Sequence, residues 1–180
     1  YSYIDSVFSG NEEKAAFFFL LGDYARYDKN VRYSNKIFIK LIRRMAENYT
    51  VGIHPSYSSS KKKGKSKVLK EKTRMEKITG SPVKIARQHF LRLKFPRTYR
   101  RLLKAGIAED FSMGYSSQTG FRAGICTPFF WYDLKKETAT NLLVYPFQVM
   151  DVTLRNYMQL SPQEAISEIV QLMEEVKKAG

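Results

Sequence analysis

Residues 49–58 read YTVGIHPSYS, a short apolar run that ends in a histidine, a proline and small polar side chains. Proline disfavours the helical conformation of the residue before it, so His54 is predicted to be extended. We therefore expect a strand that ends at His54 and is followed by a loop. In proteins built from alternating strands and helices, the chemistry lies at such carboxyl ends of strands.

Strand and helix patterns alternate on both sides of this stretch. The continuous apolar run at 15–21 is typical of a parallel strand that is covered on both faces. Asn35 is placed to cap a helix whose apolar residues form one stripe. Further strands are predicted at 83–90, 107–111 and 142–147, and further helices at 1–8, 68–78, from Pro96 to Gly106 and at 162–178. The pattern predicts an α/β fold, as a barrel or an open sheet with all strand carboxyl ends on one rim.

The chain contains two histidines, His54 and His89, and both follow runs with strand character. Asp110 belongs to the strand predicted at 107–111. Because neighbouring parallel strands bring their carboxyl ends together, these three side chains are expected in one site. For each histidine taken alone, a hydrogen-bonded imidazole at a strand end is the alternative interpretation.

Length and composition bound the class of protein. A chain of 180 residues with 43% hydrophobic content is too apolar for a disordered protein, so one domain spanning 1–180 is expected. The net charge of +14 favours anionic partners. The single cysteine, Cys126, cannot form an internal disulfide, which indicates a reducing compartment such as the cytoplasm.

The chain shows no sequence signal for a membrane or for export. No apolar run approaches the roughly 20 residues that span a bilayer. The sequence begins at Tyr1 without a signal-peptide pattern, and we interpret it as a fragment of a longer protein.

Residues 58–67 read SSSKKKGKSK, a low-complexity cationic stretch that cannot bury apolar surface. We predict a mobile basic loop within the domain. The alternative, an arm that follows the phosphates of a nucleic acid, lacks interleaved aromatic residues and a nucleic-acid motif, so nucleic acid is not the expected partner.

Five short motifs, taken together, resemble one known family. They are FFFLLGD at 17–23, GIHPSY at 52–57, RQHFLR at 87–92, DFSMGY at 110–115 and GFRAG at 120–124. The chain is similar over essentially its whole length to bacterial polysaccharide deacetylase-like proteins of the NodB-homology superfamily, in a branch found with surface-polysaccharide biosynthesis. The resemblance implies a distorted (β/α) barrel, here incomplete because the first and last strands fall outside 1–180.

The resemblance also implies an activity, the hydrolysis of N-acetyl groups from amino sugars or polysaccharides with one divalent metal ion. In the family an aspartate and two histidines four residues apart hold the metal. His54 matches the first histidine, whereas Ser58 stands at the second. We hypothesise that His89 replaces the lost ligand; the alternatives are that it supports a ligand or binds the substrate. The family's first-strand aspartate and its catalytic base have no counterpart in this chain, so the isolated chain is expected to be inactive.

Further site residues follow from the same motifs. Arg87 matches the arginine that orients the base in the family, and Asp110 matches an aspartate of related branches. Arg122 is expected to bind a sugar carboxylate or phosphate through a bidentate contact, or to fix a loop. The expected substrate-binding residues are Tyr57, Ser58, Tyr115, Phe121 and Arg122, with Trp131 as a further stacking ring.

The chemistry explains why such residues would gather. A metal-bound water with its pKa lowered towards about 7 supplies a nucleophile for amide hydrolysis at neutral pH. Imidazoles and carboxylates suit Zn, Co, Ni or Fe. A protein of the same fold that binds or organises sugars without catalysis is the second hypothesis, and Ser58 favours it. A nucleic-acid-binding module that uses residues 61–67 is the third.

Overall fold

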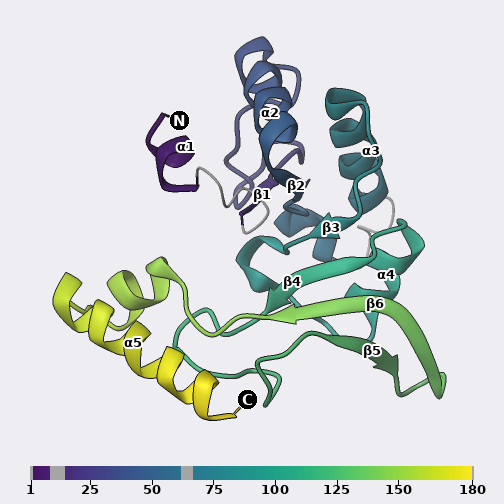
Figure 1. Cartoon of the computed structure of the whole chain (residues 1–180). Coiled ribbons are helices and arrows are strands. Elements are labelled where there is room, and N and C mark those ends of the chain that lie inside the picture. Colours follow the sequence, from purple (N-terminus) through teal and green to yellow (C-terminus); the bar gives the residue numbers. More distant parts are fainter. Residues whose placement is uncertain (1, 9–14, 62–66, 180) are drawn as a thin grey trace. The chain divides into compact units, whose positions relative to one another are not determined.

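The computed structural model describes residues 2–8, 15–61 and 67–179 (Figure 1). The chain forms two compact units, Tyr1–Glu109 and Asp110–Gly180, and each is described by itself. Both contain strands and helices, so the mixed α/β class is confirmed. Among the described residues, no helix combines the length and the apolar character that a membrane crossing needs.

The first unit contains three adjacent parallel strands. The order is β1-β2-β3, with Phe19 beside Ile53 and Ile53 beside Ala86. Their carboxyl ends therefore meet at one edge, as predicted for this part of the chain. The elements are α1 (Ser2–Phe8), β1 (Ala16–Phe19), α2 (Lys36–Asn48), β2 (Thr50–Ile53), η2 (Tyr57–Ser60), α3 (Lys67–Thr79), β3 (Ile85–Ala86), η3 (His89–Leu91) and α4 (Arg97–Lys104).

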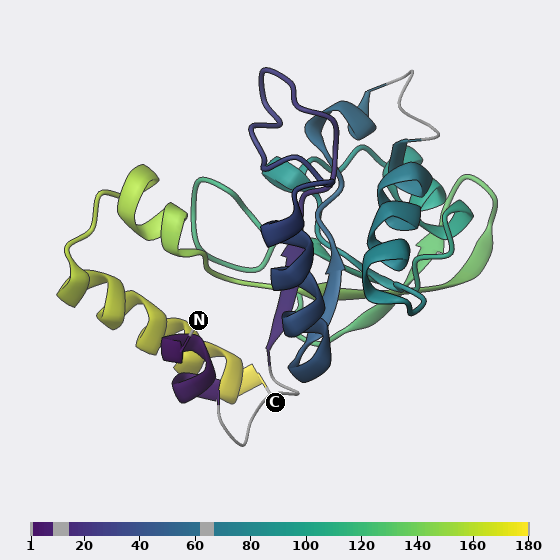
Figure 2. The same cartoon turned by 90° about the horizontal axis from the view of Figure 1, so that it is seen from above.

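Helix α2 begins where the sequence predicts. The side chain of Asn35 accepts hydrogen bonds from the backbone N–H groups of Ile37 and Phe38, both at 3.0 Å, and so satisfies two donors that the helix itself cannot pair. Helices α2 and α3 both pack against β2 and against each other (Figure 2). Met45 of α2 packs with Ala15 and Tyr49 in one buried cluster. Half-buried apolar residues of β1 and β2 pack against this cluster.

Two strands of this unit differ from the prediction. Residues of β1 are exposed or half-buried rather than covered on both faces, because β1 is the edge strand of the order. The strand predicted at 83–90 is reduced to Ile85–Ala86. Phe90 and Leu91 have φ angles of 56° and 47°, which strand geometry excludes, so the chain turns away from the sheet directly after His89.

The second unit holds the strand order β4-β6-β5. The expectation that all strands are parallel is wrong here, since β5 and β6 form an antiparallel pair with Phe129 beside Val144 and Asp133 beside Thr138. A short turn joins such a pair, whereas parallel strands need a crossover. The elements are β4 (Glu109–Met113), β5 (Phe129–Asp133), β6 (Thr138–Pro146), the π-helix η4 (Thr153–Tyr157) and α5 (Pro162–Ala179).

The two strand sets are open. In the first unit the order begins at β1, and in the second it ends at β5, so neither set closes on itself. The incomplete barrel and the single domain 1–180 therefore remain predictions. Residues Ser58–Ser60 of the predicted basic loop belong to η2, where Ser59 and Ser60 are buried. Residues 62–66 of that loop lie outside the described residues.

Candidate functional site

The carboxyl ends of β2 and β3 place the candidate site in the first unit. The backbone N–H of His54 donates to the carbonyl oxygen of Phe19 at 2.9 Å. The backbone N–H of Arg87 donates to the carbonyl oxygen of Ile53 at 3.1 Å. The backbone N–H of His89 then donates to the carbonyl of Pro55 at 3.1 Å. Because these bonds continue the strand pairing past the last strand residues, they fix the two histidine backbones next to each other.

The two histidine side chains contact each other. His54 Nε2 and His89 Nδ1 are 3.0 Å apart, and the two rings cross at 70°. His89 Nε2 lies 2.9 Å from the carbonyl oxygen of Tyr27, so it must carry a proton and donate. When both rings are neutral, His89 Nδ1 then accepts and His54 Nε2 donates. The sequence prediction that one site contains both histidines agrees with this geometry.

This proton arrangement leaves one nitrogen without a partner. His54 Nδ1 is buried and makes no hydrogen bond. Burial, reinforced by the neighbouring charges of His89 and Arg87, lowers the pKa of His54 to about 4, so the ring is neutral at pH 7. The Arg87 backbone acts in the opposite direction and raises the pKa of His54, but burial outweighs it.

Asp28 supports the loop that follows His54. Its carboxylate is 1% exposed and accepts hydrogen bonds from the backbone N–H groups of Tyr57, at 2.6 Å, and Ser58, at 3.2 Å. In the sequence this aspartate stands in a polar stretch that is typical of solvated loops. The structure instead buries it beneath the turn that begins η2.

Ser58, which was predicted to bind substrate, is held by polar neighbours. Its Oγ lies 3.0 Å from Ser56 Oγ and accepts a hydrogen bond from Lys67 Nζ at 3.1 Å. A serine hydroxyl beside an ammonium group is a poor place for a second cation. The surroundings of Ser58 therefore do not favour a cation there.

Glu71 is a buried carboxyl group that the sequence reasoning missed. It lies on α3, is 2% exposed, and accepts from the backbone and the hydroxyl of Ser56. Burial raises its pKa to about 7. The available signal was its spacing, because Glu71 falls on the same helix face as Val68, Met75 and Ile78, which are buried.

Three aromatic rings stand beside the histidine pair. The rings of Tyr27 and Tyr57 are 4.5 Å apart, and Phe90 lies 5.7 Å from Tyr57 and 4.4 Å from the ring of His89. Phe90 is 57% exposed and Tyr27 is 43% exposed. The guanidinium of Arg92 lies 4.0 Å from the centre of the Tyr57 ring. We call Tyr27, Tyr57 and Phe90 the aromatic group; of its members, the sequence reasoning missed Phe90.

The other predicted site residues belong to the second unit. Asp110 is fully buried and accepts from the backbone and hydroxyl of Ser112, at 3.0 and 2.7 Å. Arg122 donates to the carbonyl of Gly114 at 3.0 Å, a contact that fixes a loop. Tyr115 is 36% exposed. Phe121 is half-buried. Trp131 is buried at 9% exposure, so its ring is a core residue and not the exposed stacking surface expected from the sequence.

The histidine pair fits part of a metal site. Within residues 2–8, 15–61 and 67–179, no three His, Cys, Asp or Glu side chains gather as a metal-binding group. The pair itself is compatible with a shared ion, because two nitrogens bound to one tetrahedral zinc lie about 3.3 Å apart and the facing nitrogens are 3.0 Å apart. The outer nitrogen of His89 would then keep its contact with the Tyr27 carbonyl, the kind of partner that ligand histidines usually have.

Comparisons with known proteins give little further information. No protein-family model matches the chain, and no curated protein matches it. A crystal structure of a polysaccharide deacetylase from Bacillus cereus matches with a TM-score of 0.41 and 17% identity, covering 63% of this chain. The match covers 54% of that protein, so the chain spans about half of its length. The functional interpretation therefore depends on the residues of the site.

Proposed function

We propose that the first unit carries the histidine part of a metal-dependent hydrolase site that removes N-acetyl groups from sugars. The observation that supports this most directly is the 3.0 Å contact between His54 Nε2 and His89 Nδ1. In the metal-free pair only one of the two rings can keep its outer N–H bond, which accounts for the buried, unpaired Nδ1 of His54. A metal held by the facing nitrogens would let both outer nitrogens carry a proton, with the Tyr27 carbonyl as the acceptor for His89.

The two rings are suited to binding a cation. A ligand histidine must be neutral, and the lowered pKa of His54 keeps it neutral at and well below pH 7. The bound ion would polarise an acetyl carbonyl and lower the pKa of a water molecule. The protein's own share of this work is to fix the two imidazoles through the Tyr27 carbonyl and through the backbone that continues β2 and β3.

Completing the site requires carboxylates. Arg87 and Asp110 remain the proposed catalytic residues. The proposed third metal ligand is a carboxylate, in addition to His54 and His89. The ion, in this proposal Zn²⁺ or Co²⁺, Ni²⁺ or Fe²⁺, would bind weakly to two imidazoles alone. Turnover by this chain by itself is not expected.

The aromatic group is the proposed surface for the sugar ring. Tyr27 and Phe90 expose part of their rings next to His89, and sugar rings bury their apolar faces against such surfaces. Tyr57 and Ser58 lie on the same loop. Tyr115, Phe121 and Arg122 of the second unit remain proposed substrate contacts.

Cobalt titration tests the metal part. Co²⁺ bound by imidazole nitrogens gives visible absorption bands, and calorimetry gives the affinity for Zn²⁺. We expect His54→Ala and His89→Ala each to abolish the bands. Cys126→Ser serves as the matched control, because a thiol is the other strong ligand that the chain offers. Bands that persist in both histidine variants would exclude the proposed site.

A sugar-binding protein without catalysis is the second candidate. Lys67 beside Ser58, where the family has its second histidine, favours it. In this case a tetramer of N-acetylglucosamine should bind equally well with and without a chelator, and His54→Ala should leave the affinity unchanged. Binding that depends on added Zn²⁺ would instead favour the first proposal.

A further inference from the structure

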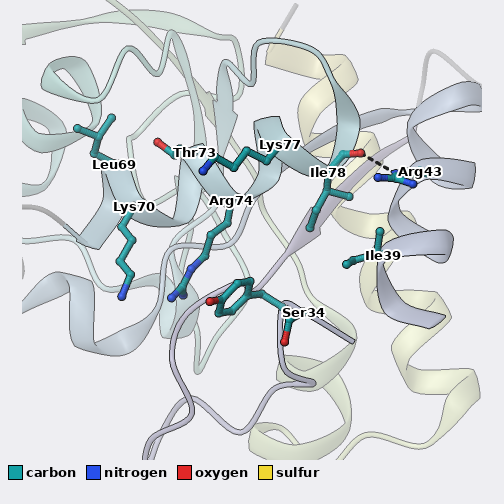
Figure 3. A pocket seen from close by; sticks show the side chains of 10 residues that line it. Ser34, Ile39, Arg43, Leu69, Lys70, Thr73, Arg74, Lys77 and Ile78 are labelled. Atoms are coloured by element: carbon teal, nitrogen blue, oxygen red, sulfur yellow. Dashed lines mark hydrogen bonds between the residues drawn. The ribbon is translucent and has the colours of Figure 1, made fainter. Parts of the chain in front are cut away.

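A second concave site lies between α2 and α3, in the first unit. It is an open pocket of about 730 Å³, lined by side chains of both helices and of the loop before α2 (Figure 3). That volume falls in the range of small-molecule sites in proteins. His54, His89 and the aromatic group do not line it. The pocket is therefore separate from the proposed hydrolase site.

The lining combines an apolar part with a strongly cationic one. Ile39, Leu69 and Ile78 supply the apolar surface. The positive charges are Arg43, Lys70, Arg74 and Lys77, and Figure 3 shows Arg43 reaching in from the α2 side while the other three come from α3. Among the described residues, no carboxylate lines the pocket.

Neighbouring groups compensate two of these cations in part. Arg74 donates to the carbonyl of Leu21 at 2.7 Å and to Asp23 at 2.6 Å, and its guanidinium lies 3.8 Å from the centre of the Tyr33 ring. Lys70 lies 3.2 Å from the other oxygen of Asp23. The carboxylate of Asp23 thus forms ion pairs with both Lys70 and Arg74, and these contacts hold Arg74 in place.

The other two cations have no carboxylate partner among the described residues. The Nε of Arg43 donates to the carbonyl of Ile78 at 3.0 Å, which leaves its terminal nitrogens for other acceptors. No ion pair forms at Lys77 within the part of the chain that the structure describes. Four cations against Asp23 leave an excess of about three positive charges around one pocket.

We propose that this pocket binds a diphosphate ester, with the phosphates on the cations and the organic part on Ile39, Leu69 and Ile78. A carboxylate would neutralise one charge, whereas a diphosphate ester carries about two to three negative charges, in line with the excess. Arginine binds phosphate oxygens in pairs and lysine binds them as a point charge. The ester could be a nucleoside diphosphate or a prenyl diphosphate, since both join this head group to a less polar part.

Calorimetric titration of the whole chain at 0.15 M salt tests the proposal, with uridine diphosphate, geranyl diphosphate and inorganic pyrophosphate as the probes. We expect saturable binding of at least one of the two esters, at least tenfold tighter than pyrophosphate. Preference for geranyl diphosphate would identify a lipid source, and preference for uridine diphosphate a nucleotide source. No saturable binding of either ester, or equal binding of pyrophosphate, would overturn the assignment.

Variants show where the ester binds. Lys77→Gln should weaken binding about tenfold, because it removes a charged contact and breaks no ion pair among the described residues. Lys104→Gln, the same change at an exposed position of α4, should alter it less than twofold. An equal loss in both variants would mean non-specific attraction and would overturn the proposal. His54→Ala should bind the ester normally, so the test is independent of the proposed hydrolase site.

Discussion

Ser56 donates two hydrogen bonds to the buried carboxyl group of Glu71. Its backbone N–H lies 2.8 Å from Oε2, and its hydroxyl lies 2.5 Å from Oε1. The contact joins α3 to the loop that carries His54. Burial and the charge of Asp28 raise the pKa of Glu71 to about 7, while the bonds from Ser56 and the charge of Arg74 oppose the rise. The proton on Glu71 is therefore linked to stability.

The first prediction concerns the pH dependence of unfolding. The pKa of Glu71 is about 7 in the folded state, against an ordinary value of 4.5 for a solvated glutamate, so the folded chain binds an extra proton between these values. Its stabilising contribution is full below pH 4.5 and is lost as the pH rises through 7. The loss is at most about 3 kcal/mol. Urea unfolding at intervals between pH 5 and 8 measures it.

Glu71→Gln supplies the test of that prediction. The amide mimics the protonated acid, because its oxygen accepts from the Ser56 N–H while its NH₂ group donates to Ser56 Oγ. We expect this variant to be the more stable form at pH 8 and to have a flatter stability profile. Glu47→Gln, on an exposed position of α2, controls for the change in net charge. Parallel profiles for Glu71→Gln and wild type would contradict the linkage.

The second prediction concerns the cap of α2. Asn35→Ala removes the acceptor for the N–H groups of Ile37 and Phe38, which should lower the free energy of unfolding by about 1 kcal/mol. Asn35→Asp keeps an acceptor at the same place and should cost much less. Denaturant unfolding of both variants measures the difference. An equal loss in the two would show that the cap bonds do not stabilise the helix.

The third prediction concerns the spacing of β2 and β3. A Cβ at Gly52 would lie 2.4 Å from Cγ1 and 2.7 Å from the carbonyl oxygen of Ile85. Gly52→Ala should therefore push the strands apart and cost about 3 kcal/mol. Gly80→Ala is the comparison: its φ of 74° is strained for alanine, but a Cβ there meets no atom within 4 Å, so about 1 kcal/mol is expected. A smaller loss for Gly52→Ala than for Gly80→Ala would contradict this interpretation of the contacts.

Much of the first unit was predictable because short stretches of its sequence mark where helices begin and strands end. Asn35 followed by an apolar stripe predicted α2, and His54 before Pro55 predicted the end of β2. The pairing of the two histidines followed from the rule that neighbouring parallel strands end at one edge. These inferences depend only on residues near one another in the sequence and on the parallel pairing of neighbouring strands.

Other features depend on packing or on backbone conformation that local patterns do not reveal. A strand was predicted over 83–90, but the positive φ values of Phe90 and Leu91 turn the chain away from the sheet. Glu71 was not singled out from the sequence, although its spacing with buried residues was a usable signal. In β5, Trp131 and Asp133 are buried while Phe130 and Tyr132 are exposed. An exposed phenylalanine and a buried aspartate hide this period of two from the sequence.

The last prediction separates backbone strain from ligand contact at Phe90. This residue has a φ of 56°, a conformation that costs a residue with a Cβ about 1 kcal/mol or more relative to glycine. Its ring is 57% exposed, so truncation removes little packing. Phe90→Gly and Phe90→Ala lose the same ring, yet Phe90→Gly should be the more stable by about 1 kcal/mol.

Both Phe90 variants should weaken the binding of a tetramer of N-acetylglucosamine to the same degree, because each removes the ring beside His89. Denaturant unfolding and calorimetry on the same samples give the two quantities. Tyr24→Ala is the matched control, since Tyr24 is 75% exposed and lies outside the aromatic group. An equal loss of sugar affinity in the two Phe90 variants would show that the ring itself contributes to binding. Affinity that survives in Phe90→Gly but falls in Tyr24→Ala would show that the sugar binds elsewhere.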